Sequence, residues 1–126
     1  MASVAGLGLI MLGEVKLETE DILCTLSRLI EREPPESILI PTYKQCTFLY
    51  DFIIKNNLVS AVFALQRMEP GDPRYADQAI SDAVDKFNTC ENGLKGKPPS
   101  PIGAKDKYAR ELTVIALSII KVLEGS

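Results

Sequence analysis

The sequence lacks histidine and tryptophan altogether, and aromatic residues make up only 6% of it. Histidine is the commonest general base at neutral pH and the commonest protein ligand of zinc. Its absence excludes a Ser-His-Asp triad or a Cys-His pair, and leaves only catalysis by carboxylates or lysines. We therefore expect a protein that is not an enzyme, that holds no metal or cofactor, and whose core is built from Leu, Ile, Val and Ala.

Positive charge is also scarce. The chain has 14 basic and 17 acidic residues and a net charge of −3, with no basic stripe, so nucleic-acid binding has no electrostatic support. The apolar run over residues 4–12 is too short to span a bilayer. No basic residue precedes Lys16, so this run does not fit a signal peptide. We interpret it as the start of a helix, and expect neither a secretion signal in this chain nor a membrane partner.

Only three cysteines are present, at positions 24, 46 and 90. The odd count means that one is unpaired or that all are reduced. Cys46 and Cys90 lie about equally far before and after a predicted turn between two antiparallel helices. Their spacing leaves two interpretations open: a bridge between these helices, or small residues of the core. Cys24 lies beside the apolar stripe of the first helical segment, and we expect it to be a buried free thiol.

Apolar residues recur at helical spacing through most of the 126 residues, and no strand pattern competes. The pattern predicts four helices: one from residue 4 to the stop at Glu33-Pro34-Pro35, then about 42–68, 72–94 and 104–123. The connections are short apart from the proline-rich residues 95–103. The predicted fold is all-α, a single domain over residues 1–126 that forms an antiparallel up-down-up-down four-helix bundle.

The apolar faces of these helices can be predicted as well. In the second helix, Phe52 and Phe63 widen the predicted buried face. In the fourth helix, the predicted seam consists of Tyr108, Leu112, Ile115, Ile119 and Val122. The acidic pairs at spacing i, i+3, Glu18 with Asp21 and Asp82 with Asp85, lie off these faces, so we interpret them as solvated surface rather than a di-metal site.

The turn before the third helix reads Gly71-Asp72-Pro73-Arg74-Tyr75. Asp72 is a good N-cap and Pro73 suits the first helical position, so a simple helix start explains both. It does not explain Arg74 and Tyr75, which are expected to be exposed at the tip of the hairpin. Arg and Tyr dominate binding hot spots. Asp72, Pro73, Arg74 and Tyr75 are therefore the candidate target-binding residues.

Five short motifs occur in order along the chain: Tyr43-x-x-Cys46-x-x-x-Tyr50, Gly71-Asp72-Pro73-Arg74-Tyr75-Ala76, Ser81-x-Ala83, Cys90-Glu91-x-Gly93 and Leu112-x-x-Ile115-Ala116-Leu117-x-Ile119. Together they resemble the plant invertase and pectin methylesterase inhibitor family, over about residues 7–125. The resemblance implies an up-down-up-down bundle in which Cys46 and Cys90 form a disulfide between the second and third helices. It also implies a non-catalytic inhibitor of a plant carbohydrate-active enzyme, in the cell wall or the vacuole.

The same resemblance suggests two targets. Invertase inhibitors of the family insert a Pro-Lys-Phe motif into the sucrose-binding cleft, and Pro73, Arg74 and Tyr75 match it conservatively. Acid invertase (β-fructofuranosidase) is therefore the leading target. Pectin methylesterase inhibitors use the outer faces of the second and third helices, which makes pectin methylesterase the alternative target; pollen allergens belong to the family too. An intracellular helical interaction module with free thiols is the alternative from a different class.

The chain departs from the family at its front. Members begin with a signal peptide and a short helical hairpin that is closed by its own cysteine pair, and this chain shows neither. We expect part of one bundle end to be exposed as a result. The expected state is a monomer, with a dimer through the exposed end as the alternative.

Overall fold

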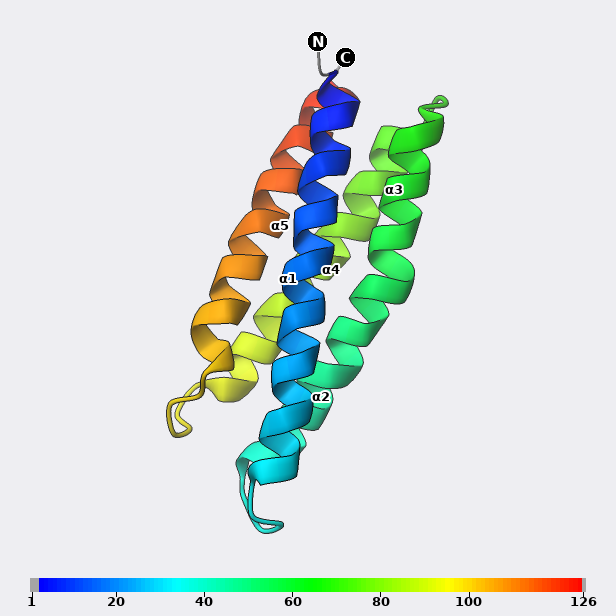
Figure 1. The fold of residues 1–126 in the computed structure, drawn as a ribbon. Coiled ribbons are helices and arrows are strands. Elements are labelled where there is room, and N and C mark those ends of the chain that lie inside the picture. The colour runs from blue at the N-terminus through cyan, green and yellow to red at the C-terminus, as the bar shows by residue number, and fades with distance from the viewer. Residues whose placement is uncertain (1–2, 126) are drawn as a thin grey trace.

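The computed structural model describes residues 3–125, all of whose regular elements are helical. The elements are α1 (Val4–Arg32), α2 (Leu39–Phe52), the π-helical turn η1 (Ile53–Asn57), α3 (Leu58–Arg67), α4 (Asp72–Leu94) and α5 (Ile102–Glu124). Because α2, η1 and α3 form one continuous helix, four long helices run alternately up and down (Figure 1). The predicted all-α antiparallel bundle is confirmed.

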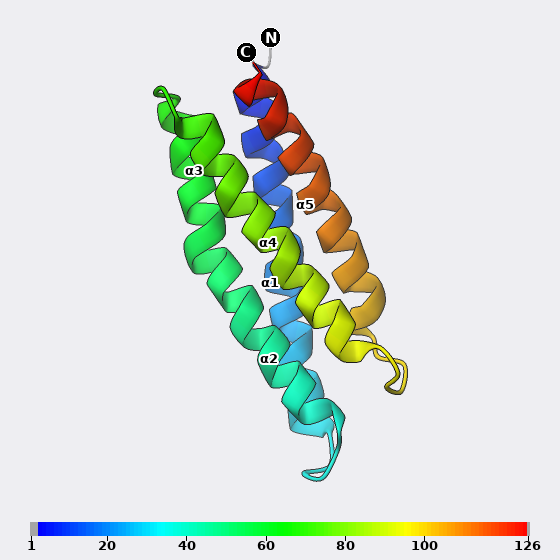
Figure 2. The same ribbon diagram turned by 180° about the vertical axis from the view of Figure 1, so that it is seen from behind.

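The helices form a square in cross-section. α1 packs against α5 and against the α2–α3 helix, and α4 packs against the same two neighbours, so α1 and α4 are diagonally opposed. Both termini and the turn between α3 and α4 lie at one end of the bundle (Figures 1 and 2). This arrangement places the candidate turn at an end of the molecule, away from the connections α1–α2 and α4–α5.

Local sequence sets the limits of α1. The Ser3 hydroxyl accepts a hydrogen bond from the Gly6 amide at 2.9 Å, which caps the first turn. Pro34 ends the helix, because the residue before a proline is driven out of the helical region. The interpretation of residues 4–12 as the start of a helix is confirmed. At Gly8 a Cβ would lie 3.0 Å from a Leu65 methyl, so glycine permits close packing of α1 on α3.

The continuous helix Leu39–Arg67 is, among the described residues, the one helix long and apolar enough to cross a membrane. Core helices of soluble proteins share this property. Here Cys46, Tyr50, Ile53 and Ala61 are completely buried between the other helices. One face of this helix is thus part of the core, while Phe48, Val59 and Phe63 on other faces are exposed.

Two predicted apolar faces are wrong. Phe52 and Phe63 are exposed, although both were expected to be buried. In α5 the inward face lies beside the predicted seam and consists of Ile102, Asp106, Ala109, Thr113, Ala116 and Ile120; Tyr108, Ile115 and Val122 of the predicted seam are exposed. Both stripes have the same spacing of three and four residues. Close packing of neighbouring helices favours the stripe with small alanine and threonine side chains.

Candidate target-binding surface

A disulfide joins Cys46 of α2 to Cys90 of α4, with the two Cα atoms 5.1 Å apart. Both cysteines are completely buried. The bridge expected from the resemblance is therefore present, and it fixes the α2–α3 helix against α4 along the hairpin. Cys24 is free but exposed, so the expectation of a buried thiol was wrong.

The turn at the end of this hairpin is held by Asp72, though not in the predicted way. Gly71, with φ at 90°, occupies the cap position, and Asp72 is the first residue of α4. The buried Asp72 carboxylate accepts hydrogen bonds from Arg67 Nε at 2.9 Å, from Arg67 Nη2 at 2.6 Å and from the Glu69 amide at 2.7 Å. Asp72 therefore ties the end of α3 to the start of α4 instead of capping its own helix.

Electrostatics agree with this structural role. The hydrogen bond from Arg67 holds the pKa of Asp72 below its usual value, although removal of the carboxylate from water opposes this effect. Met68, the last residue before the turn, has a φ of 53° in the left-handed region that side chains other than glycine rarely adopt. The Arg67–Asp72 ion pair closes the turn in which this strained residue lies.

Arg74 and Tyr75 are both exposed, but they lie on different sides of the tip. Arg74 and the half-buried Pro73 line a shallow depression that Leu123 and Glu124 of α5 also line. Tyr75 lines a groove on the flank between α3 and α4. The four predicted residues are consecutive in sequence, yet they occupy different places. Asp72 is buried and braces the turn, Pro73 and Arg74 lie at the tip, and Tyr75 lies on the flank.

The groove on this flank, called here the α3–α4 groove, has a volume of about 320 Å³. Its lining includes the rings of Phe52 and Tyr75 and the side chains of Asn56, Ser60 and Gln78. Tyr75 is 55% exposed and Phe52 is 40% exposed. Exposed aromatic rings beside neutral amides are suited to binding another protein, because they bury much apolar area and still offer hydrogen bonds.

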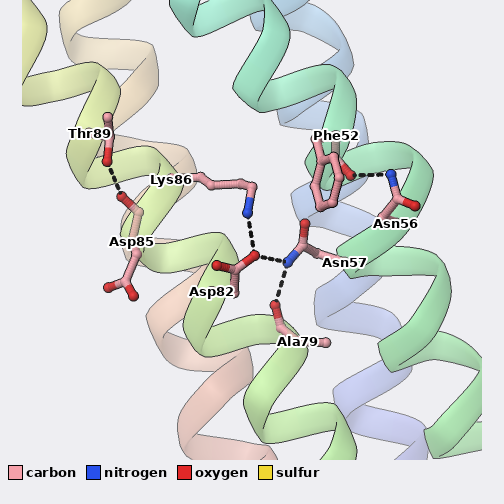
Figure 3. Close-up of polar contacts among 8 residues, drawn as sticks. All are labelled: Phe52, Asn56, Asn57, Ala79, Asp82, Asp85, Lys86 and Thr89. Carbon is pink, nitrogen blue, oxygen red and sulfur yellow. Dashed lines mark hydrogen bonds and ion pairs between the residues drawn. The ribbon is translucent and has the colours of Figure 1, made fainter.

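Asn57, Ala79 and Asp82, which line the α3–α4 groove, belong to a cluster of polar contacts (Figure 3). Asn57 Nδ2 donates to the Ala79 carbonyl oxygen and to Asp82 Oδ2, each at 2.8 Å. Lys86 pairs with the same Asp82 carboxylate, and its ammonium lies 4.6 Å from the centre of the Phe52 ring. The bonds from Lys86 and Asn57 hold the pKa of Asp82 below its usual value. The cluster thus orients Phe52 and joins α4 to the α2–α3 helix.

Asn57, which belongs to the π-helical turn η1, was not among the residues predicted from the sequence. A π turn adds a residue to a helical turn and is frequent at functional sites. The side chain of Asn57 is buried and directed at α4, as Figure 3 shows, while its neighbour Asn56 is exposed. The pair Asn56-Asn57 inside an apolar helix was the available sequence signal.

One member of each acidic pair is held by a lysine. Asp21 pairs with Lys105 and Asp82 with Lys86, and the described part of the chain contains no group of three or more potential metal ligands. Asp21, Asp82 and Asp85 are all exposed.

One further acid was missed because it lies on the unexpected inward face of α5. Asp106 is completely buried, and neither of its carboxylate oxygens has a hydrogen-bond partner among residues 3–125. Burial raises the pKa of Asp106 to about 7, although the nearby charge of Arg110 opposes the shift. Arg110 itself donates from Nε to Glu91 of α4 at 2.8 Å.

The fold of the bundle is similar to that of solved pectin methylesterase inhibitors. The structure is similar to the crystal structure of a pectin methylesterase inhibitor from Arabidopsis thaliana, with a TM-score of 0.86 and 22% identity over 98% of this chain and 80% of that one. A mutant form of a pectin methylesterase inhibitor from Arabidopsis gives a TM-score of 0.83 and 25% identity over 96% of this chain and 79% of that one. No family model matches the sequence, and no curated protein is similar to it. The structural match over nearly the whole chain confirms at the level of fold what the sequence motifs suggested.

Proposed function

We propose that the chain is a non-catalytic inhibitor of a carbohydrate-active enzyme of the plant cell wall, with pectin methylesterase as its target. The similarity to pectin methylesterase inhibitors over 98% of the chain carries this proposal. The Cys46–Cys90 bridge supports an oxidising location such as the cell wall or the vacuole. It also disfavours an intracellular module with free thiols.

The α3–α4 groove is the proposed contact surface. Tyr75 and Phe52 offer the exposed rings, and Asn56 and Gln78 offer amide groups beside them. The disulfide and the Arg67–Asp72 ion pair hold this surface in one conformation before binding. Less conformational entropy is then lost on association, and this favours tight binding by a small protein.

Acid invertase is the second candidate target, and the exposed Arg74 favours it. Glycosidases commonly place two carboxylates at the scissile bond, and a cation at the tip of a rigid hairpin could pair with them. Pro73 and Arg74 lie together at the tip, next to the end of α5. In this binding mode Arg74 supplies the binding energy, and Asp72 only holds Arg74 in position.

Inhibition assays on both enzymes with three variants test these alternatives. For pectin methylesterase, Tyr75→Ala should weaken inhibition by an amount on the order of 1–3 kcal/mol, and Arg74→Ala should have little effect. The opposite pattern on invertase would favour the tip mode. Tyr108→Ala is the matched control, because Tyr108 is 52% exposed on α5, away from both surfaces. Inhibition of both enzymes that is unchanged in all three variants would refute both contact surfaces.

A further inference from the structure

A larger groove lies between α1 and α3, on the flank of the α2–α3 helix that faces away from the α3–α4 groove. Its volume is about 760 Å³, within the range of small-molecule sites. Apolar side chains dominate the lining: Leu9 and Leu12 from α1, and Leu58, Val59, Val62 and Phe63 from α3. This α1–α3 groove is unrelated to the proposed inhibitory surface.

The charged groups of the groove are all positive. Lys16 and Lys55 line it, and no acidic residue does. Lys55 is paired with Asp51 at 3.0 Å, whereas the Lys16 ammonium has no ion-pair or hydrogen-bond partner within residues 3–125. α1 and α3 run antiparallel (Figure 1). By their order along the two helices, Lys16 and Lys55 therefore lie at the same end of the groove, and Leu9 and Phe63 lie toward the other.

One end of the groove is therefore positively charged, and the rest of its lining is predominantly apolar. Along η1 and α3 the lining extends from Ile54 to Gln66, which corresponds to about 18 Å of helix. A ligand that matches this arrangement has an anionic head and an extended apolar tail of comparable length.

Gly13 supplies an independent observation. It lies inside α1, where glycine weakens a helix, and it lines the groove. A Cβ at Gly13 would meet nothing within 4 Å, in contrast to Gly8, where it would contact Leu65. Close packing within the protein therefore does not require glycine at position 13. The lack of a side chain at Gly13 leaves the wall of the groove open.

We propose that the α1–α3 groove binds an anionic amphiphile of the fatty-acid class. The acyl chain lies on the apolar floor formed by Leu12 and Leu58, and the carboxylate lies between the ammonium groups of Lys16 and Lys55. Lys16 is the principal anchor, because Asp51 already compensates part of the charge of Lys55.

Isothermal titration with sodium laurate below its micelle concentration tests the proposal. Dodecyltrimethylammonium is the matched probe, with a similar tail and the opposite charge. We expect one laurate per chain, weaker binding at high salt, and no saturable binding of the cationic probe. Equal binding of both probes would show detergent-like adsorption and would overturn the proposal.

Variants locate the site. Gly13→Leu should fill the groove and abolish laurate binding without loss of stability, since the new side chain enters open space. Gly103→Leu is the control, because Gly103 is also a helical glycine with open space around it, but on α5. Lys16→Gln should weaken binding about fivefold, and Asp51→Asn should tighten it by freeing Lys55.

Two results would overturn the assignment. Unchanged laurate binding by Gly13→Leu would place the ligand elsewhere. A dimer in sedimentation experiments that Gly13→Leu converts to a monomer would show that a second copy of the chain fills the groove.

Discussion

Replacing the buried Asp106 with asparagine should stabilise the protein at neutral pH and remove most of its pH dependence there. Both oxygens of Asp106 lack partners in the core, and burial raises its pKa to about 7. Folding must therefore either bury a charge or bind a proton. Asparagine keeps the shape of the side chain and carries no charge.

The size of the effect follows from the span between the ordinary pKa of 3.8 and about 7. At 1.36 kcal/mol per pH unit, this span corresponds to about 4 kcal/mol. Because the folded pKa lies above the unfolded one, the cost is absent below about pH 4, grows as the pH rises, and is complete above about pH 7. An asparagine amide without partners costs about 1–3 kcal/mol in turn, so the net gain at pH 7.5 should be about 1–3 kcal/mol.

Denaturant unfolding followed by circular dichroism between pH 5 and 7.5 measures this effect. The absence of histidine helps, because no such side chain contributes to the pH dependence in this range. The free energy of unfolding of the parent should fall across the range, while that of Asp106→Asn should stay nearly constant. Asp85→Asn, at an exposed position of α4, should follow the parent. Parallel curves for parent and Asp106→Asn would refute the raised pKa.

Two further predictions concern the hairpin. Exchanging Cys46 and Cys90 for serine should lower the free energy of unfolding by about 4 kcal/mol, from the chain-entropy treatment of a loop with a sequence separation of 44 residues. Thiol titration of the denatured parent should find one free thiol, Cys24, before reduction and three after it. Three free thiols before reduction would contradict the bridge. Arg67→Ala should lower the melting temperature at pH 7 because it leaves the buried Asp72 carboxylate without its main partner. Since the pKa of Asp72 is lowered in the folded state, the difference in melting temperature between parent and variant should shrink as the pH falls below 3.8. An undiminished difference at pH 3 would argue against the ion pair as the cause.

Much of the fold could be predicted because its signals are local. The prolines at 34 and 73 mark a helix end and a helix start, and apolar spacing gave four helices. The pairing of Cys46 with Cys90 stayed open on spacing alone; the resemblance to a family implied it, and the structure contains it. The four candidate target-binding residues remain a prediction, and the structure shows how they are arranged. They were chosen as an exposed helix start at the tip of a hairpin, whereas the α3–α4 groove joins Tyr75 to Phe52, more than twenty positions earlier.

The sequence by itself determined that the chain is helical, that histidine chemistry is absent, and where the helices begin and end, because these properties depend on residue types and near neighbours. Only the tertiary structure decided which of two equally spaced stripes on α5 faces inward, and with it the burial of Asp106. It also decided that Asp72 pairs with Arg67 rather than capping its helix. The physical reason is that each of these outcomes depends on how closely another helix approaches. The spacing of residues along one helix does not specify that distance.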